Sequence, residues 1–522
     1  MPSPLIDALH DPACYPHPVD EVEMRETHIS WVLLAGDYAY KIKKPVDFGF
    51  LDFSTLARRR HFCREEIRLN RRTAPDLYLD VVALAGTLQK PVVGGAGEPI
   101  EFAVRMQRFD PADGFDRLLE AGRLEPAHVD ALGEALAELH QSAERAPSES
   151  TWGRPAEVIA PMRDNFTTLR ERLADAARQQ RLQRLEEWTE ERFAVLRATI
   201  QARREQGFVR ECHGDVHLGN VTLFKGRTTL FDCIEFSPDL RWTDVMADLA
   251  FVVMDLRERG AQAMAWRLLD RYLARTGDYR GLKLLDFYVV YRALVRAKVA
   301  ALGLDEDGDA DANASIFATV DSHLALAAGV AAKQRPALVL TCGVAGSGKS
   351  YLARSLLADC GLVRLRSDVE RKRLFGLDEL ARTDSPPGGG LYSRRATQQT
   401  YDRLLELAGA VADAGLPALV DATFLSAERR QAFADLARRR QLSFGVLVCT
   451  ADEATLRERV AKRASAGSDA SEADLEVLEK QLEAFQPPVS GDDRIMTINT
   501  AAAGSEEKAR AWLSRVLSAG RG

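Results

Sequence analysis

Residues 213–232 read HGDVHLGNVTLFKGRTTLFD, and this stretch decides the fold of the first part of the chain. Asp215 and Asn220 lie five residues apart, so one loop can place a carboxylate beside a substrate hydroxyl and an amide oxygen beside a metal ion. A strand-like run, Thr228 to Phe231, leads to Asp232, which is placed to be a second Mg²⁺ ligand. The three side chains support one another, and together they predict a kinase-like fold with Asp215 as its catalytic residue.

A lysine that holds the nucleotide phosphates is expected upstream of this loop. Lys41 follows Ala39 on the second strand of a predicted hairpin, and a glutamate on the next helix can pair with it. Lys43 lies on the same face of the strand, so only the spacing to Ala39 favours Lys41. Glu66 is the predicted partner, with Glu65 as the open alternative.

The second part of the chain carries GVAGSGKS at residues 343–350, which fits the pattern GxxxxGK[ST] throughout. It follows a predicted strand and opens a predicted helix, which is the setting that this phosphate-binding loop requires. Backbone N–H groups and the helix N-terminus both favour phosphate oxygens there. The residues predicted to bind the nucleotide are Gly343, Gly346, Ser347, Gly348, Lys349 and Ser350. Among them Lys349 would also act in transfer, and Ser350 would bind Mg²⁺.

Two further strand ends point to the same crevice, because ligands lie at the carboxyl ends of the strands in parallel α/β sheets. Asp368 and Arg371 follow the second strand, three residues apart. Asp368 is predicted to accept a hydroxyl proton and Arg371 to hold an anionic acceptor. Asp421 ends the third strand and is predicted to lie near Mg²⁺. Each aspartate has an alternative role as the N-cap of a helix, with Arg371 as a solvated side chain.

A basic helix begins near Leu456 and runs into the small, polar stretch Ser465 to Ser471, which is predicted to be a mobile loop. Such a lid can close over ATP and neutralise the charge that develops during transfer. Arg459 is predicted to be catalytic and Arg463 to bind ATP. An exposed basic helix face is the alternative.

Apolar patterning divides the chain into two folds. Residues 1–333 read as strands followed mainly by helices, and the motif of Asp215, Asn220 and Asp232 predicts that they form an α+β bilobal domain of the protein-kinase type, with an N-lobe over about 1–110 and a C-lobe over about 111–333. Residues 334–522 alternate strand and helix, which predicts an α/β P-loop NTPase domain with a parallel sheet. Its expected strands are Ala337–Cys342, Val363–Ser367, Ala418–Val420, Phe444–Thr450 and Arg494–Asn499.

Composition excludes several classes of protein. The 522 residues are 46% hydrophobic and 28% charged, unlike a disordered chain or a fibre. The seven scattered cysteines suggest neither a disulfide framework nor a zinc site. The net charge of −7 argues against bulk attraction to nucleic acid. The N-terminus does not read as a signal peptide and no apolar run approaches the ~20 residues of a membrane span, so a cytoplasmic protein without a membrane partner is expected.

The first part of the chain, over about residues 25–333, resembles the aminoglycoside phosphotransferase-like family, also called the choline/fructosamine kinase-like group. The hallmark of that family, HGDxHxxN, is His213 to Asn220 here. The resemblance implies that Asp215 is catalytic and that Asn220 and Asp232 bind Mg²⁺. The chain departs from the glycine-rich nucleotide turn of kinases, because the corresponding turn reads Thr27-His28-Ile29-Ser30.

The second segment, Pro336 to Gly522, resembles small P-loop kinases of the AAA_33 type, polynucleotide 5′-kinases, zeta-toxin-like kinases and gluconate kinases. In these kinases an Asp-x-x-Arg after the second strand supplies the base and an arginine that binds the acceptor. Here that motif is Asp368-Val-Glu-Arg371. The fused arrangement resembles bacterial chains described as bifunctional aminoglycoside phosphotransferase/ATP-binding proteins.

These observations predict a bifunctional phosphotransferase that uses ATP and Mg²⁺. Each site would transfer the γ-phosphoryl group to a hydroxyl of a small molecule that the sequence does not identify. In one alternative, one domain binds nucleotide and switches the other. In the second alternative, the P-loop domain phosphorylates nucleic-acid 5′-OH ends. Arg364 and Arg366 support this last alternative, and the acidic net charge opposes it.

Overall fold

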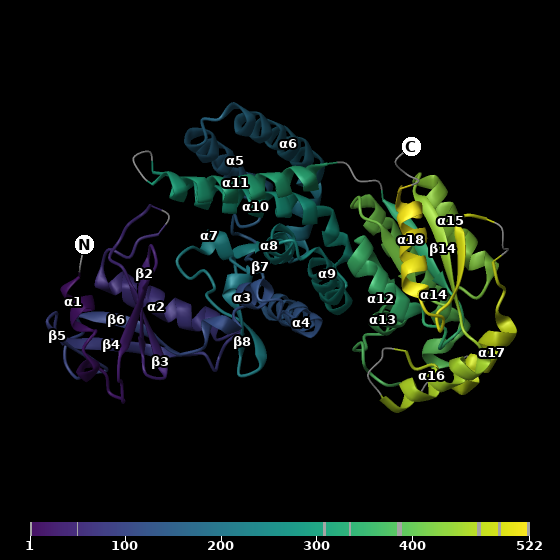
Figure 1. Ribbon diagram of the computed structural model, residues 1–522, viewed down its shortest axis with the longest axis horizontal. Helices are drawn as coiled ribbons and strands as arrows, with labels where there is room; N and C mark the ends of the chain where they lie inside the picture. The colour runs from purple at the N-terminus through teal and green to yellow at the C-terminus, as the bar shows by residue number, and fades with distance from the viewer. Residues whose placement is uncertain are drawn as a thin grey trace. The chain divides into compact units, whose positions relative to one another are not determined.

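The computed structural model describes residues 3–49, 51–305, 309–332, 336–383, 389–466, 471–488 and 492–518. The chain forms two compact units (Figure 1). The first contains Met1–Pro161 and Arg197–Asp255, and the second contains Met162–Leu196 and Leu256–Gly522. The predicted domain boundary between residues 333 and 334 lies outside the described residues and stays a prediction.

The first unit contains a six-stranded antiparallel sheet in the order β1-β2-β3-β6-β4-β5. The strands are β1 (Val22–Glu26), β2 (Ser30–Ala35), β3 (Tyr38–Lys43), β4 (Tyr78–Thr87), β5 (Lys90–Val93) and β6 (Glu101–Gln107). The predicted hairpin is confirmed as β2 and β3. Helix α2 (Leu56–Asn70) begins after Thr55, whose hydroxyl accepts a hydrogen bond from the Arg58 N–H, and it packs against β4 and β6 (Figure 1).

The rest of the first unit includes α1 (Pro4–Ala8), which contacts β5, and the elements around the loop that follows β7. These elements are α3 (Phe115–Glu120), α4 (Pro126–Ser142), β7 (Val209–Glu211), β8 (Val221–Phe224), β9 (Arg227–Leu230), α7 (Pro238–Arg241), β10 (Trp242–Asp244) and most of α8 (Val245–Glu258). The hairpin of β8 and β9 connects the loop that ends at Asn220 to Asp232. Because the two strands are paired, Asn220 and Asp232 both lie near the open end of the hairpin. Helix α8 is buried on nearly all sides, as expected for a helix that is apolar around its circumference.

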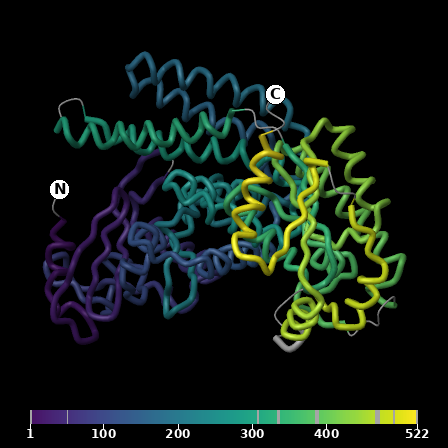
Figure 2. The backbone as a smooth tube through the Cα atoms, turned by 45° about the vertical axis from the view of Figure 1, so that its right-hand side comes forward, coloured from purple at the N-terminus to yellow at the C-terminus, as the bar shows by residue number. Residues whose placement is uncertain are grey.

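The second unit begins with long helices, which are α5 (Pro155–Arg172), α6 (Ala176–Glu205), α9 (Gln262–Thr276), α10 (Leu285–Leu302) and α11 (Ala310–Ala331). Helices α5 and α6 contribute residues to both units. Helix α11 runs along α10 (Figure 2). Its buried side chains are Val320, His323, Leu324 and Ala327, which lie on one face of the helix.

Helix α11 corrects the expectation that no apolar stretch approaches the length of a membrane span. Among the described helices it alone is long and apolar enough to cross a membrane by length and composition. The sequence scan overlooked it because Asp321 and His323 interrupt the apolar run. A helix in the core of a soluble protein passes the same test, so this feature is weak evidence for a membrane.

The second unit also contains a five-stranded parallel sheet, which confirms the predicted fold class. The order is β12-β13-β11-β14-β15. The strands are β11 (Ala337–Cys342), β12 (Val363–Arg366), β13 (Ala418–Asp421), β14 (Ser443–Thr450) and β15 (Ile495–Asn499). All five predicted strands are present, with bounds that differ by at most one residue. The central strand β11 is buried along its whole length.

Helices flank this sheet (Figure 1). They are α12 (Lys349–Cys360), α13 (Ser367–Leu374), α14 (Arg394–Asp413), α15 (Ala427–Arg439), α16 (Glu453–Ala466), α17 (Leu475–Ala484) and α18 (Ser505–Ser518). Most of the segment predicted to be a mobile loop, residues 465–471, lies outside the described residues.

Candidate active sites

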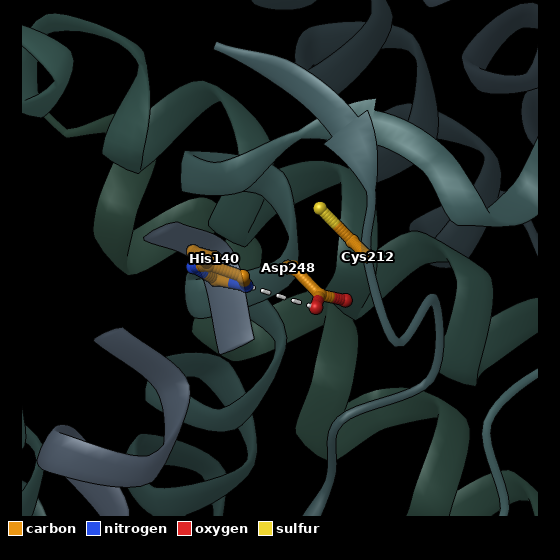
Figure 3. A group of neighbouring side chains, drawn as sticks. All are labelled: His140, Cys212 and Asp248. Atoms are coloured by element: carbon orange, nitrogen blue, oxygen red, sulfur yellow. Dashed lines mark hydrogen bonds and ion pairs between the residues drawn. The ribbon is translucent and has the colours of Figure 1, made fainter. Parts of the chain in front are cut away.

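The loop that carries Asp215 is anchored from below by Asp248, a fully buried carboxylate on α8. Its oxygens accept hydrogen bonds from the backbone N–H groups of His213, at 3.0 Å, and Gly214, at 2.9 Å. Nε2 of His140 on α4 lies 3.1 Å from the same carboxylate (Figure 3). The backbone N–H groups of His213 and Gly214 lie outside the strands, and the Asp248 carboxylate satisfies both of them. The start of the loop is therefore fixed in place.

His140, Cys212 and Asp248 lie close enough together to hold a metal ion. All three are buried, and the Asp248 oxygens already accept two backbone hydrogen bonds. Burial raises the pKa of the Cys212 thiol well above its usual value. This group therefore supports the loop.

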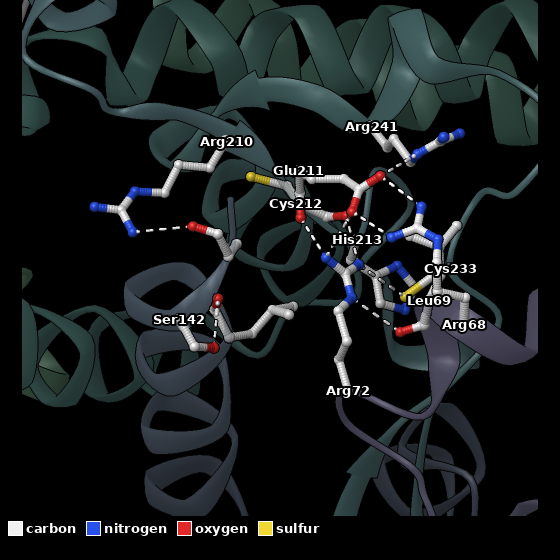
Figure 4. Close-up of polar contacts among 12 residues, drawn as sticks. Arg68, Leu69, Arg72, Ser142, Arg210, Glu211, Cys212, His213, Cys233 and Arg241 are labelled. Carbon is white, nitrogen blue, oxygen red and sulfur yellow. Dashed lines mark hydrogen bonds and ion pairs between the residues drawn. The ribbon is translucent and has the colours of Figure 1, made fainter. Parts of the chain in front are cut away.

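A second anchor holds strand β7, directly before the loop (Figure 4). The Glu211 carboxylate contacts Arg68 at 2.8 Å and Arg241 at 3.1 Å. Arg72 donates to the carbonyl oxygens of Glu211, at 2.6 Å, and Cys212, at 3.1 Å. Burial by itself raises the pKa of Glu211, but the guanidinium groups of Arg68 and Arg241 outweigh burial and hold that pKa at about 2. Helix α2 and strand β7 are thereby tied together.

The loop from His213 to Asn220 brings Asp215 and Asn220 together, as the sequence predicts. The Asn220 side-chain amide donates to the Asp215 carbonyl oxygen at 2.9 Å and lies 3.3 Å from its carboxylate. His217 Nε2 lies 3.5 Å from the Asp215 carboxylate. The Asp215 side chain keeps 36% of its surface exposed, so a hydroxyl group can reach it.

A buried network of charges joins the sheet to Asp232. Lys41 Nζ lies 2.8 Å from Glu66 Oε1 and 2.6 Å from Asp232 Oδ1. Lys43 Nζ lies 2.7 Å from the other Glu66 oxygen and also contacts Glu235. Burial lowers the pKa of Lys41, but Asp232 and Glu66 raise it well above its usual value. Both lysines are therefore held in their charged form.

This geometry separates the alternatives that the sequence left open. Lys41 reaches Asp232, whereas Lys43 is fully buried between Glu66 and Glu235. Glu66 lies in the network, whereas Glu65 pairs with Arg68 on the other side of α2. Sequence reasoning missed Glu235, because no spacing rule connects it to Lys43 before the chain folds.

The residues of the second site surround the end of β11. Gly343, Gly346 and Gly348 have φ values of +140°, +77° and +81°. A Cβ atom at Gly343 would lie 2.4 Å from the carbonyl oxygen of Cys449, so only glycine fits there. Lys349 is the first residue of α12, and this strand–loop–helix arrangement is the one predicted for a phosphate-binding loop.

Lys349 is turned back onto its own loop. Its Nζ donates to the carbonyl oxygen of Val344 at 2.7 Å and lies 3.5 Å from Ser347 Oγ. Burial lowers the pKa of Lys349, and the nearby Asp421 only partly offsets this effect. The ammonium group is therefore poorly solvated, and an anionic ligand would stabilise it.

A cavity of about 280 Å³ lies at the carboxyl ends of β12 and β13. It is lined by most of the residues predicted for this site, namely Lys349, Ser350, Asp368, Arg371, Asp421 and Arg463. Neither aspartate is an N-cap, because α13 is preceded by Arg366 and α15 by Ser426 at that position. Asp421 Oδ2 is buried and has no hydrogen-bond partner in the described part of the chain.

Arg371 lies beside Asp368 in this cavity. Its Nη1 is 3.1 Å from Asp368 Oδ1, and its guanidinium lies 4.9 Å from the centre of the Tyr392 ring. Its Nε is buried without a hydrogen-bond partner among the described residues. Sequence reasoning missed Tyr392, and also Arg429, which covers the Tyr401 ring at 4.4 Å in the same cavity. No motif marks these side chains.

The two arginines of the predicted lid helix lie in different places. Arg463 lines the cavity and donates to the Ala473 carbonyl oxygen at 3.1 Å. Arg459 is absent from the described lining of the cavity. It donates to Thr500 Oγ1 at 2.8 Å and to the Gly346 carbonyl oxygen at 3.3 Å, so it supports the phosphate loop from outside.

One amide of the phosphate loop is occupied by a side chain that the sequence did not indicate. Gln481 on α17 accepts a hydrogen bond from the Ala345 N–H at 2.7 Å. A phosphate oxygen bound in this loop would compete for the same N–H group.

Comparisons with known proteins match both parts of the chain. The phosphotransferase enzyme family (APH) matches residues 60–285, and the AAA domain of the AAA_33 type matches residues 338–488. An uncharacterized protein of Mycobacterium tuberculosis (strain ATCC 25618 / H37Rv) is 30% identical over 465 residues, which cover 88% of this chain and 91% of that protein. A Mycobacterium bovis protein matches over the same length with the same identity.

Solved structures are similar to each part separately. An amicoumacin kinase bound to AMP-PNP, Ca²⁺ and Ami is 12% identical and covers 62% of this chain and 92% of its own, with a TM-score of 0.40. The APS kinase of Mycobacterium tuberculosis, bound to AMPPNP and APS, is 22% identical and covers 35% of this chain and 99% of its own, with a TM-score of 0.26.

Proposed function

Because this chain belongs to the family of kinases that join a phosphotransferase enzyme domain to an AAA domain, we propose that it transfers the γ-phosphoryl group of ATP to hydroxyl groups at two sites. The observation that carries the proposal is the contact of Lys41 with both the buried Glu66 and the partly exposed Asp232. A lysine fixed in this way beside the loop of Asp215 and Asn220 is the arrangement that phosphoryl transfer requires.

At the first site, the exposed carboxylate of Asp215 accepts the proton of the acceptor hydroxyl. The acceptor oxygen then bonds to the γ-phosphorus, the bond from that phosphorus to the bridging oxygen breaks, and ADP leaves. Lys41 binds the α- and β-phosphates, and Glu66 fixes its ammonium group. Positioning and charge neutralisation supply most of the catalysis of such a reaction.

The residues present fit Mg²⁺ at both sites. The first network holds the three carboxylates of Glu66, Asp232 and Glu235 against two lysines, which leaves one negative charge for a cation. Asn220 and Asp232 would hold the ion there. At the second site, Ser350 and the buried, unpartnered Asp421 would hold it. Mg²⁺ neutralises phosphate charge when it is bound.

At the second site, the phosphate loop and Lys349 bind the β- and γ-phosphates, with Arg463 closing over them. Asp368 accepts the hydroxyl proton, as Asp215 does at the first site. Arg371 binds an anionic group of the acceptor, because its buried Nε needs a hydrogen-bond acceptor. Arg459 acts by holding Gly346 and Thr500 in place. The proposed acceptor is a small hydroxyl compound.

The experiment that tests this function follows γ-labelled ATP into a cell extract separated into metabolite and RNA fractions. Wild type, Asp215→Ala and Lys349→Ala are compared. We expect two labelled products, one lost with each variant, each by at least about a thousand-fold. A product that survives both substitutions contradicts the assignment of these sites. ATP hydrolysis without any labelled acceptor would favour the regulatory alternative, in which one domain switches the other.

Label in RNA that Lys349→Ala abolishes would instead support a nucleic-acid acceptor for the second site, especially if it declines steeply with salt. The structure offers this alternative little support. Arg364 is buried against Asp270, and Arg366 is paired with Glu379, so both arginines already have protein partners.

A further inference from the structure

Helix α9 belongs to the segment that matches the phosphotransferase family, yet it packs against the P-loop part of the second unit. Its Trp266 meets Gly361, the residue that ends α12 before strand β12 begins. A Cβ atom at Gly361 would lie 2.9 Å from Trp266 Nε1, and its φ is +70°. The indole ring therefore needs this glycine, and the two elements fit closely at the start of β12.

The next contact along α9 is a buried ion pair. Arg364 on β12 donates two hydrogen bonds to the Asp270 carboxylate, at 3.2 Å and 2.7 Å. The Arg364 side chain is 4% exposed and that of Asp270 is 13% exposed. Such a bidentate pair fixes distance and orientation together. Strand β12 is thus held to α9 two residues before its carboxyl end.

Arg271, the next residue on α9, is linked to the lining of the cavity through Glu379. Arg271 Nη1 lies 2.8 Å from Glu379 Oε2, and the other oxygen of Glu379 lies 2.9 Å from Arg366 Nη1. Arg366 lines the cavity and lies opposite Asp421 in the register of the parallel strands β12 and β13. It also precedes helix α13, which carries Asp368 and Arg371.

From these contacts we propose that Asp270 and Arg271 of α9 are positioning residues of the P-loop site. Asp270 fixes strand β12, and Arg271 fixes Arg366 through Glu379. The second site is therefore completed by a helix of the phosphotransferase segment, and a change in α9 reaches the acceptor side of the cavity through two contacts. This inference rests on the proposed phosphotransfer at the second site.

The test uses the full chain with Asp215→Ala, so that only the second site transfers label. Arg271→Gln and Asp270→Asn are compared with Arg275→Gln on the same helix. Arg275 also contacts the P-loop part, through Asp378, but this pair is more exposed than that of Arg271 with Glu379, and neither Arg275 nor Asp378 belongs to the described lining of the cavity. Exposed pairs of this kind contribute little to stability, which makes Arg275→Gln a matched control.

Two readouts separate positioning from simple destabilisation. A dilution series of the extract gives the half-saturating acceptor concentration, and an ATP titration gives the corresponding value for ATP. Hydrogen exchange is followed in peptides that cover α13 and, as an internal reference, α18. In Arg271→Gln and Asp270→Asn we expect the half-saturating acceptor concentration to rise about ten-fold, while the half-saturating ATP concentration stays within about two-fold of its original value. Hydrogen exchange is expected to become faster at α13 and to stay unchanged at α18.

A third variant tests the role of Glu379, which links Arg271 to Arg366. Glu379→Gln is expected to reproduce Arg271→Gln, and adding Arg271→Gln to it is expected to cause no further loss, because both act through one contact. If Asp270→Asn fails to fold, Arg271→Gln carries the test, since its side chain is partly exposed.

The inference is overturned if Arg271→Gln and Asp270→Asn behave like Arg275→Gln in both readouts. An equal rise in the half-saturating concentrations of acceptor and of ATP would also overturn it, because that pattern indicates a general loss of structure at the site. If the Asp215→Ala chain transfers no label at all, the proposed function of the second site fails, and exchange at α13 alone then decides whether α9 positions that helix.

Discussion

The two sites handle the charge of their lysines in opposite ways. At the first site, Lys41 and Lys43 are enclosed by Glu66, Asp232 and Glu235, so carboxylates exceed ammonium groups. At the second site, Lys349 contacts only a backbone carbonyl and a hydroxyl at hydrogen-bond distance within the described chain, while the arginines Arg371, Arg429 and Arg463 share its cavity.

This difference indicates which charge of ligand each site favours. Excess buried carboxylate favours a cation, whereas a cavity rich in arginine favours an anion. The first site is therefore preorganised by its own side chains and depends on them for stability. The second site is preorganised by backbone and by glycine conformations, and its lysine is stabilised by the ligand.

Glu66→Gln is expected to cause a large loss of transfer, because Glu66 is the carboxylate that both lysines of the first site share. Transfer at the first site is expected to fall at least about a hundred-fold, while transfer at the second site stays unchanged. The neighbouring Glu65→Gln is the control, since Glu65 pairs with Arg68 outside the network. Equal losses from the two variants in the label-transfer assay would contradict the assignment of Glu66.

Lys43→Met and Lys41→Met sharpen the comparison within the first site. Lys43 is fully buried, and its removal leaves the buried Glu235 without its lysine partner and Glu66 with Lys41 alone, which costs about 3–5 kcal/mol of unfolding free energy. Lys41→Met is expected to lose transfer with a smaller loss of stability, because Asp232 remains partly exposed. Urea unfolding alongside the transfer assay measures both. The reverse pattern would make Lys43 the lysine that binds ATP.

Acid is expected to weaken the first unit through Glu211. Its folded pKa of about 2 lies below the usual carboxyl value, so its ion pairs stabilise the fold above about pH 4.5, and this contribution disappears as the pH falls toward 2. Glu211→Gln is therefore expected to be less stable than wild type at pH 6, with a difference that shrinks toward pH 3. Urea unfolding at both pH values measures it, and the exposed Glu21→Gln serves as the control. A constant difference would exclude this linkage.

The smallest effect is expected at the second site, from Gln481→Ala. Gln481 occupies the Ala345 N–H, so its removal frees one donor for a phosphate oxygen. A hydrogen bond is worth about 1 kcal/mol, which predicts about five-fold tighter binding of Mg·AMP-PNP by calorimetry. Glu483→Gln on the same helix is expected to change nothing. Weaker binding in Gln481→Ala would show that Gln481 supports the loop instead of competing with the ligand.

Much of the fold followed from local patterns. The five strands of the parallel sheet and the β2–β3 hairpin lie where the sequence places them, because apolar runs bounded by turn residues reflect local chemistry. The clustering of Asp368, Arg371 and Asp421 also followed, since the carboxyl ends of parallel strands meet at one edge.

Other features depended on side chains that are distant in the sequence. Arg459 and Arg463 lie one helical turn apart, yet only Arg463 reaches the described lining of the cavity. Tyr392, Tyr401 and Arg429 belong to no motif, and they join the site only through the packing of α14, α15 and the short turn Gly390–Tyr392 before α14. Spacing along a helix determines which side chains share a face, but it does not determine what that face meets.

The sequence by itself determined the two folds, the phosphate loop and the pairing of Asp215 with Asn220, because each depends on residues close together in the chain. Both Lys41 and Lys43 lie on one face of β3, and only the tertiary structure distinguished their surroundings, because Lys41 contacts Glu66 and Asp232 whereas Lys43 contacts Glu66 and Glu235. Likewise, the contact of α9 with β12 joins residues 94 positions apart. Such contacts depend on long-range packing, for which a local pattern carries no information.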